Sequence, residues 1–139
     1  MIRVWCLDPG QTTGVALFSL DDQTLTFVNS EDIVLWEGLD ERILPGDRIV
    51  YENIIARHPS FNPIGIEVIG VVKYLARLRD CLLVRHSPTM ITGVQKWPIF
   101  QWKHIKSPHQ RDAISHGIVY AKSQGLTLIL PEKFKTLST

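Results

Sequence analysis

The sequence predicts a mixed α/β fold whose sheet is partly antiparallel. Three short apolar runs separated by turn residues fill the first 30 positions, a pattern typical of a β-meander. A strand pattern, a helix pattern and a second strand pattern follow, in the order of a βαβ unit. Another helix pattern lies near the carboxyl end. Consecutive strands with short turns are antiparallel and strands joined by a helix are parallel, so the sheet should contain both arrangements.

The meander is expected to have strands over residues 2–7, 14–20 and 25–28. Between the first two strands, Pro9 fixes φ for a turn, and Gly10 and Gly14 can adopt positive φ without steric cost. After the third strand, residues 31–43 are expected to form a short helix, because Pro45 and Gly46 then interrupt the chain.

The βαβ unit should have strands over residues 48–51 and 81–84, with Glu52 directly after the first of them. Its helix is expected over residues 64–79, because Asn62 can cap it and Pro63 suits a first turn. Apolar side chains recur there at helical spacing and on a wide stripe, so this helix should be well buried. The stripe comprises Ile64, Val68, Val71, Leu75 and Leu78, widened by Ile66, Ile69 and Val72.

The last helix should begin at Ser107, since Ser can cap it, Pro108 suits its first position and Gln110 completes a capping box. It is expected to run to about Ser123 and to stop near Gly125. Residues 126–130 are a candidate for a short extra strand, whereas residues 87–106 have no clear pattern.

The composition is that of a globular chain with one domain over residues 1–139. Hydrophobic residues make up 45% and charged residues 21%, and no apolar run reaches the ~18 residues that cross a bilayer. The chain starts directly on a strand pattern, without the features of a secretory signal. Cys6 and Cys81 both lie in apolar runs, which predicts buried free thiols in a reducing, cytoplasmic compartment and no membrane association.

The charge is distributed unevenly along the chain. Residues 1–52 carry 10 acidic and 3 basic side chains, whereas residues 53–139 carry 4 acidic and 12 basic ones. Between Lys73 and Arg111 eight basic residues accompany the single acid Asp80. A basic half can bind a polyanion such as DNA, or can simply be a solvated face, and charge alone leaves both interpretations open.

Three carboxylates lie at the ends of predicted elements. Asp8 ends the first strand, Glu52 ends the fourth and Asp112 lies near the start of the last helix. If the first and fourth strands are parallel neighbours, Asp8 and Glu52 project from one edge, and a helix across that edge brings Asp112 to them. Carboxylates gathered in this way repel one another unless a cation binds, and Mg²⁺ prefers such oxygen ligands.

Each carboxylate also has a structural explanation. Asp8 before Pro-Gly fits a turn, Glu52 fits an ordinary strand edge, and Asp112 fits an acid near a helix N-terminus. The case for a site therefore rests on all three occurring in this order on these elements.

Two histidines share the helical face of Asp112. His109 is three residues before it and can ligate a metal, orient water or protonate a leaving oxygen. His116, four residues after it, is interpreted as a partly buried structural histidine.

In these motifs the chain resembles the ribonuclease H-like nucleases, and among them the RuvC-like Holliday junction resolvases of phage type. The motifs are Leu7-Asp8-Pro9-Gly10, Thr13-Gly14, Val50-Tyr51-Glu52, the helix segment 67–76 and His109-Gln110-Arg111-Asp112-Ala113. The resemblance implies a ribonuclease H-like fold with a five-stranded mixed sheet flanked by helices. It also implies a homodimer that cleaves four-way DNA junctions and that a phage or prophage could encode.

The resemblance further implies hydrolysis by two metal ions, Mg²⁺ or in its place Mn²⁺, with Asp8, Glu52 and Asp112 as ligands. His109 falls where relatives carry an Asp or a His, so it joins the expected catalytic and metal-binding residues. One departure concerns the aromatic residue that relatives often place soon after the middle Glu. Here the nearest is Phe61, which with Arg57 and His58 is the best substitute for contacting the junction.

Other DNA contacts are expected from basic residues. Residues 96–106 interleave aromatic and cationic side chains, a composition that suits phosphate contact and base stacking. The tryptophans there equally suit a core or a dimer interface, so the cations are the better candidates. The basic candidates are Arg77, Arg85, Lys96, Lys103, Lys106 and Arg111.

Three other functions remain open from the sequence. Another ribonuclease H-like nuclease would act on RNA–DNA hybrids, forks or single strands. A non-catalytic nucleic-acid-binding module could use the same fold, although it would not need three acids. An actin-like ATPase shares the core fold but requires two such domains.

Overall fold

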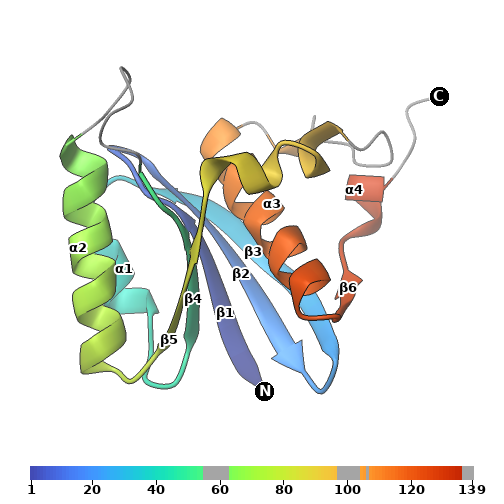
Figure 1. The fold of residues 1–139 in the computed structure, drawn as a ribbon, viewed down its shortest axis with the longest axis horizontal. Coiled ribbons are helices and arrows are strands. Elements are labelled where there is room, and N and C mark those ends of the chain that lie inside the picture. Colours follow the sequence, from blue (N-terminus) through green and yellow to red (C-terminus); the bar gives the residue numbers. More distant parts are fainter. Residues whose placement is uncertain (55–62, 97–103, 106, 136–139) are drawn as a thin grey trace.

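The computed structural model describes residues 1–54, 63–96, 104–105 and 107–135. The protein has three layers, with a sheet between helices (Figure 1). Helices α1 (Glu37–Arg42) and α2 (Pro63–Leu78) cover one face of the sheet, and α3 (Pro108–Ser123) covers the other. The predicted mixed α/β fold, with helices on both sides of the sheet, is confirmed. None of the described helices is long and apolar enough to span a membrane.

The sheet has six strands in the order β5-β4-β1-β2-β3-β6. These are β1 (Ile2–Asp8), β2 (Thr13–Asp21), β3 (Thr24–Ile33), β4 (Arg48–Glu52), β5 (Leu82–His86) and β6 (Thr127–Ile129). The first three strands form the predicted antiparallel meander, and β4 and β5 are parallel to β1. The candidate extra strand is β6, which pairs in parallel with β3, so the sheet has one strand more than the expected five.

Strand β1 lies at the centre of the sheet and is buried on both faces. Its side chains alternate, with Val4 and Cys6 in the core beneath α3 and Trp5 and Leu7 in the core beneath α2. This burial on both faces explains why β1 reads as a continuous apolar run and not as an alternating one.

Strand β3 is longer than expected and the helix after it is shorter. Residues 31–33 were predicted as helix, but they pair with Val15, Gly14 and Thr13 of β2, and the helix spans only Glu37–Arg42. The prediction of a helix over residues 31–43 is therefore wrong at its start. The hydrogen bonds offered by the long strand β2 outweigh the local preference of these residues.

Helix α2 is less buried than its apolar composition predicts. Only the stripe that faces the sheet is covered, and Ile64 and Ile66 are each 41% exposed while Leu78 is 63% exposed. A helix in an outer layer contacts the sheet along one side only, which leaves the remaining apolar positions uncovered. Cys6 is buried as predicted, whereas Cys81, at the end of the α2–β5 turn, is only partly buried.

Two short 3₁₀ helices, η1 (Pro88–Ile91) and η2 (Val94–Lys96), occupy part of the segment without a clear sequence pattern, and a short helix α4 (Glu132–Lys135) follows β6. Helix α3 begins as predicted, because the Ser107 hydroxyl accepts a hydrogen bond from the Gln110 amide at 3.3 Å. The Gln110 side chain does not complete the capping box; it instead accepts from Ser30 of β3 at 2.7 Å. The helix ends before Gly125, which has a φ of +65°.

The start of α3 rests directly on Gly14 of β2. A Cβ atom at Gly14 would lie 2.0 Å from the His109 carbonyl oxygen, so only glycine leaves space for the helix there. Gly10 and Gly14 were expected to supply positive φ, but neither does; the positive φ values belong to Gly46 and Gly125 among the glycines described. Gly14 is needed because it allows the backbone of α3 to approach β2 closely.

We expect Gly14→Ala to destabilise the protein by about 1–3 kcal/mol, because the helix must move away from β2. Gly93→Ala is a matched control, since a Cβ there meets nothing within 4 Å and its φ is negative. Its effect should stay within about 0.5 kcal/mol. Urea unfolding of both variants measures the difference, and equal stabilities would contradict the packing assigned to Gly14.

Candidate functional site

Three carboxylates meet where β1 and β4 end. The parallel pairing sets Leu7 opposite Tyr51, so that Asp8 and Glu52 follow side by side at the same edge of the sheet. Helix α3 covers one face of the sheet and starts near these strand ends, so that Asp112 in its second turn reaches the two acids. One oxygen from each of the three carboxylates lies within 4.8 Å of the others.

Each of these carboxylates contacts a nitrogen of a neighbouring side chain. Asp8 Oδ2 lies 3.3 Å from His109 Nδ1, and Glu52 Oε1 lies 3.1 Å from His116 Nε2. Gln95 of η2 donates from Nε2 to Asp112 Oδ1 at 2.6 Å. These contacts fix the direction in which each carboxylate points.

The crowding of the carboxylates changes their acidity. Burial, a hydrogen bond with Glu52 and the charges of Glu52 and Asp112 raise the pKa of Asp8 to about 9. Burial also raises the pKa of Asp112, with the charge of Glu52 adding to it and the hydrogen bond from Gln95 opposing it. Burial acts to raise the pKa of Glu52 too, but the hydrogen bonds with His116 and Asp8 outweigh it and lower this pKa. These opposite shifts favour a proton on Asp8 over a proton on Glu52.

The donor set fits a hard divalent cation. The three carboxylates offer only oxygen atoms, they lie within reach of one ion, and they repel each other without a positive partner. An ion bound there would lower the pKa of Asp8 and release its proton, so the arrangement could hold a metal.

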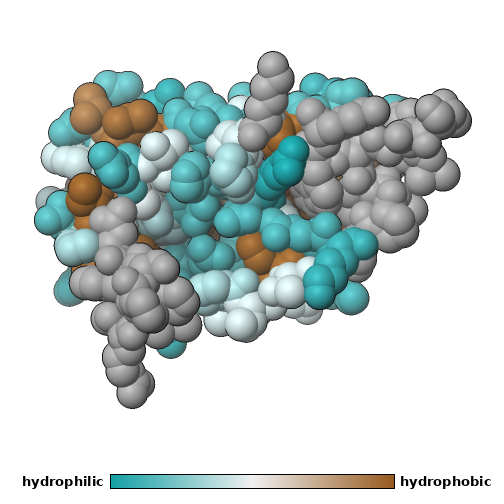
Figure 2. Space-filling view, turned by 90° about the horizontal axis from the view of Figure 1, so that it is seen from above, coloured by the Kyte–Doolittle hydropathy of each residue, from teal (hydrophilic) through white to brown (hydrophobic). Residues whose placement is uncertain are grey.

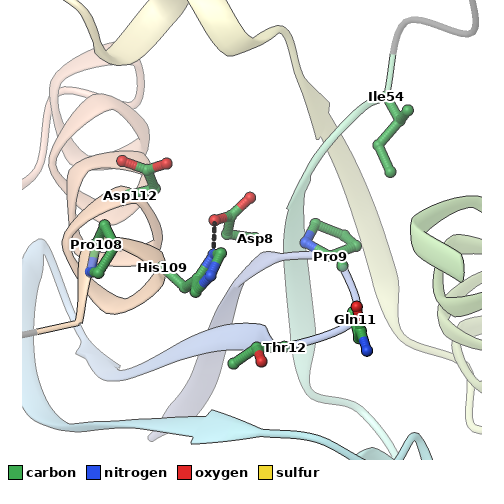
Figure 3. A pocket seen from close by; sticks show the side chains of 9 residues that line it. Asp8, Pro9, Gln11, Thr12, Ile54, Pro108, His109 and Asp112 are labelled. Carbon is green, nitrogen blue, oxygen red and sulfur yellow. Dashed lines mark hydrogen bonds and ion pairs between the residues drawn. The ribbon is translucent and has the colours of Figure 1, made fainter. Parts of the chain in front are cut away.

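The site opens into a pocket on the surface (Figure 3). The carboxylates of Asp8 and Asp112 and the ring of His109 lie along one side of it, and the β1–β2 turn and Ile54 lie on the other. Figure 2 views this end of the molecule, and its described surface is mostly hydrophilic. The pocket gives solvent and ligands access to the carboxylates.

The sequence-predicted DNA contacts differ in their distance from this site. Arg111 lines a small pocket together with Asp112 and Gln95, and the exposed Lys96 follows Gln95 directly. Arg85 is exposed on β5 next to His86, which pairs with Glu52. Arg77 is exposed in the last turn of α2, roughly 21 Å along the helix from its first residue, Pro63. Arg57, His58, Phe61, Lys103 and Lys106 lie outside the described residues.

Sequence reasoning missed Gln95, which contacts Asp112, and His86, which contacts His116, and it understated the role of His116. His116 is fully buried, as a structural histidine would be, yet it also contacts Glu52. His86 is buried behind it, and the two Nδ1 atoms are 2.9 Å apart. His86 could have been found because it ends a strand beside Glu52, whereas Gln95 lies in a segment without periodicity.

Comparisons with known proteins support the fold. No protein-family model and no curated protein sequence matches this chain. The chain is similar to a structure of Thermus thermophilus RuvC in complex with a Holliday junction substrate, with 13% identity, a TM-score of 0.60, and coverage of 91% of this chain and 99% of that one. A second Thermus thermophilus RuvC structure gives 12% identity, a TM-score of 0.57 and the same coverage. The ribonuclease H-like fold implied by the sequence resemblance is thus confirmed.

The raised pKa of Asp8 predicts that Asp8→Asn stabilises the metal-free protein. Because the folded state binds this proton more tightly than the unfolded state, stability falls as the pH rises from about 4 towards about 9. The amide stays neutral and can still donate to Glu52. We expect a gain of at least about 1 kcal/mol, or roughly 3 °C in Tm, at pH 8, and a smaller one at pH 5.

Thermal melts in EDTA at the two pH values measure this gain. Asp21→Asn, at the exposed end of β2, is the control and should change Tm little at either pH. A gain for Asp8→Asn that did not grow with pH would contradict the assigned protonation.

Proposed function

We propose that this protein is a metal-dependent endonuclease that cuts branched DNA, with a four-way junction as substrate. The observation that carries the proposal is the cluster of Asp8, Glu52 and Asp112 at the end of β1 and β4. The fold shared with a protein whose structure holds a Holliday junction supports the choice of substrate. The ribonuclease H-like alternatives, with hybrid, fork or single-stranded substrates, use the same chemistry and are separated by experiment.

In this proposal the three carboxylates hold Mg²⁺ or Mn²⁺, with two ions in the site. Such ions, when bound, activate a water molecule and stabilise the leaving oxygen of a phosphodiester. The chain supplies the geometry: Asp8 and Glu52 are fixed by strand register, and Asp112 is fixed by α3. Asp8 is buried and Glu52 and Asp112 are partly buried, so bulk water would compete less with these acids for the ions.

His109 lines the same pocket and is more exposed than Asp8. Its side chain is 46% exposed, compared with 12% for Asp8, and only one of its ring nitrogens contacts Asp8. We assign it to the catalytic group as a ligand or as the residue that orients water or delivers a proton to the leaving oxygen. In this proposal Lys96, Arg111 and Arg85 contact phosphates of the DNA backbone, as expected for basic side chains.

We expect Asp8→Asn to bind a four-way junction but to lose cleavage in Mg²⁺ by more than about 100-fold. Even the hydrogen-bond partners of metal ligands are worth about 10- to 100-fold, so a ligand should be worth more. Gel-shift and cleavage assays on a labelled junction measure the two properties, with Asp21→Asn as an active control. Cleavage by Asp8→Asn at the wild-type rate would remove Asp8 from the catalytic group.

The substrate is tested with the same assay on a panel of DNA structures. Junction, fork, duplex, single strand and RNA–DNA hybrid are each incubated with Mg²⁺, Mn²⁺ or EDTA. The proposal expects the junction to be cut fastest and EDTA to abolish cleavage. Faster cleavage of the hybrid, fork or single strand would support the alternative nuclease instead.

We also propose that the active form is a homodimer, since a four-way junction needs paired cuts and a two-fold dimer presents two identical sites. The exposed apolar side chains beside α2 suit this contact. Tyr74, Leu78 and Trp36 line a groove there and are 61%, 63% and 49% exposed. Contiguous exposed apolar patches often mark protein interfaces.

Sedimentation of the wild type should therefore give twice the chain mass of 15.8 kDa. Tyr74→Glu should shift the protein towards the monomer because it places a charge in the apolar contact, whereas Lys73→Glu on the neighbouring exposed position is the control. A monomeric wild type at assay concentrations would contradict the dimer.

A further inference from the structure

The buried histidines behind Glu52 form a chain of hydrogen bonds that the proposed chemistry does not itself use. His116 is 0% exposed and His86 is 4% exposed, and their ring centroids are 5.1 Å apart. His86 ends β5, and His116 lies in the middle of α3, so the chain links two elements across the sheet edge. It ends on Glu52 Oε1.

The positions of the protons in this chain follow from the acceptor at its end. A carboxylate only accepts, so the hydrogen bond to Glu52 requires a proton on His116 Nε2. In a neutral ring His116 Nδ1 is then an acceptor, and the proton shared between the two rings belongs to His86 Nδ1. One arrangement of protons therefore satisfies both hydrogen bonds with two neutral imidazoles.

We propose that the His86–His116 pair positions Glu52 for metal binding: His86 fixes the tautomer of His116, and His116 holds the Glu52 carboxylate in its direction towards Asp8 and Asp112. This inference rests on the proposed function, because it gives Glu52 its role as a metal ligand. His86 and His116 are positioning residues, since neither lies among the three carboxylates that would meet the ion.

A purely structural role explains the pair less well. Burying two imidazoles costs free energy that apolar side chains of similar size would avoid, unless each hydrogen bond is made. Here the two buried rings are hydrogen-bonded to each other, and His116 contacts Glu52, whose pKa is lowered whereas those of Asp8 and Asp112 are raised. Partners that orient a ligand in this way typically change metal affinity by about 10- to 100-fold.

The tautomers can be read directly in the metal-free wild type. Protein labelled with ¹⁵N-histidine is examined by long-range ¹H–¹⁵N NMR at about pH 7.5. The proposal expects the proton of His116 on Nε2 and that of His86 on Nδ1. Any other placement of these protons would overturn it.

Two matched substitutions at each histidine separate hydrogen bonding from packing. The amide nitrogen of Gln can replace Nε2 of a histidine, and that of Asn can replace Nδ1. His116→Gln keeps a donor for Glu52 and His116→Asn does not, whereas His86→Asn keeps a donor for His116 and His86→Leu does not. Thermal melts establish which variants are folded, and only folded variants are compared.

Mn²⁺ binding without DNA, measured by calorimetry, is the main readout. We expect His116→Asn and His86→Leu to weaken binding by about 10- to 100-fold, and His116→Gln and His86→Asn to stay within about threefold of the wild type. Equal affinities for the folded members of either pair would overturn the positioning role. His116→Asn and His86→Leu should also lower kcat for the junction more than they raise KM.

The two proposals fail in different ways. If the wild type cuts no nucleic acid but the tautomers and the order of Mn²⁺ affinities are as expected, the nuclease function fails and the positioning of Glu52 stands. If the wild type cuts the junction and His116→Asn binds Mn²⁺ as tightly as His116→Gln, the positioning fails and the nuclease stands.

Discussion

The parallel register between β1 and β4 is the constraint on which the site depends. Because Leu7 lies opposite Tyr51, the next residue on each strand is an acid, and the two acids emerge side by side. A slip of one residue would turn one carboxylate to the opposite face of the sheet, and the apolar side chains of that strand would exchange faces with it. The same apolar pattern that makes β1 a central strand therefore also holds Asp8 beside Glu52.

Each end of the β1–β4 pair has a buried aspartate, and the pKa values of the two are shifted in opposite directions. Asp47, just before β4, accepts hydrogen bonds from Arg3, Trp5 and the Leu44 amide at 2.7–2.8 Å. Burial acts to raise its pKa, but these partners outweigh burial and lower it. Asp8 at the other end has acids for neighbours, and its pKa rises. Asp47 is an acid whose partners lie within the fold, whereas Asp8 is an acid whose environment favours a cation from solution.

Much of this arrangement could be predicted from the sequence, because strand ends and helix starts leave local signals. Asp8 and Glu52 follow apolar runs, and Asp112 follows a capped helix start, so each could be assigned to an element end. The contact between His86 and His116 could not, since it depends on how closely α3 crosses β5. Residues 31–33 were not predicted as a strand because their pairing depends on β2. The exposure of Ile66 and Leu78 was not predicted because it depends on which layer α2 occupies.

The separation of the three acids along the chain has a consequence during synthesis. Asp8 and Glu52 come from the first half of the chain, but Asp112 arrives only with α3, which docks on Gly14 and packs across β1 and β2. A nascent chain that still lacks α3 holds two of the three carboxylates and has no complete ligand set. Under the proposed function, cation binding would therefore require that α3 has docked, and a chain without α3 would be inactive on nucleic acid.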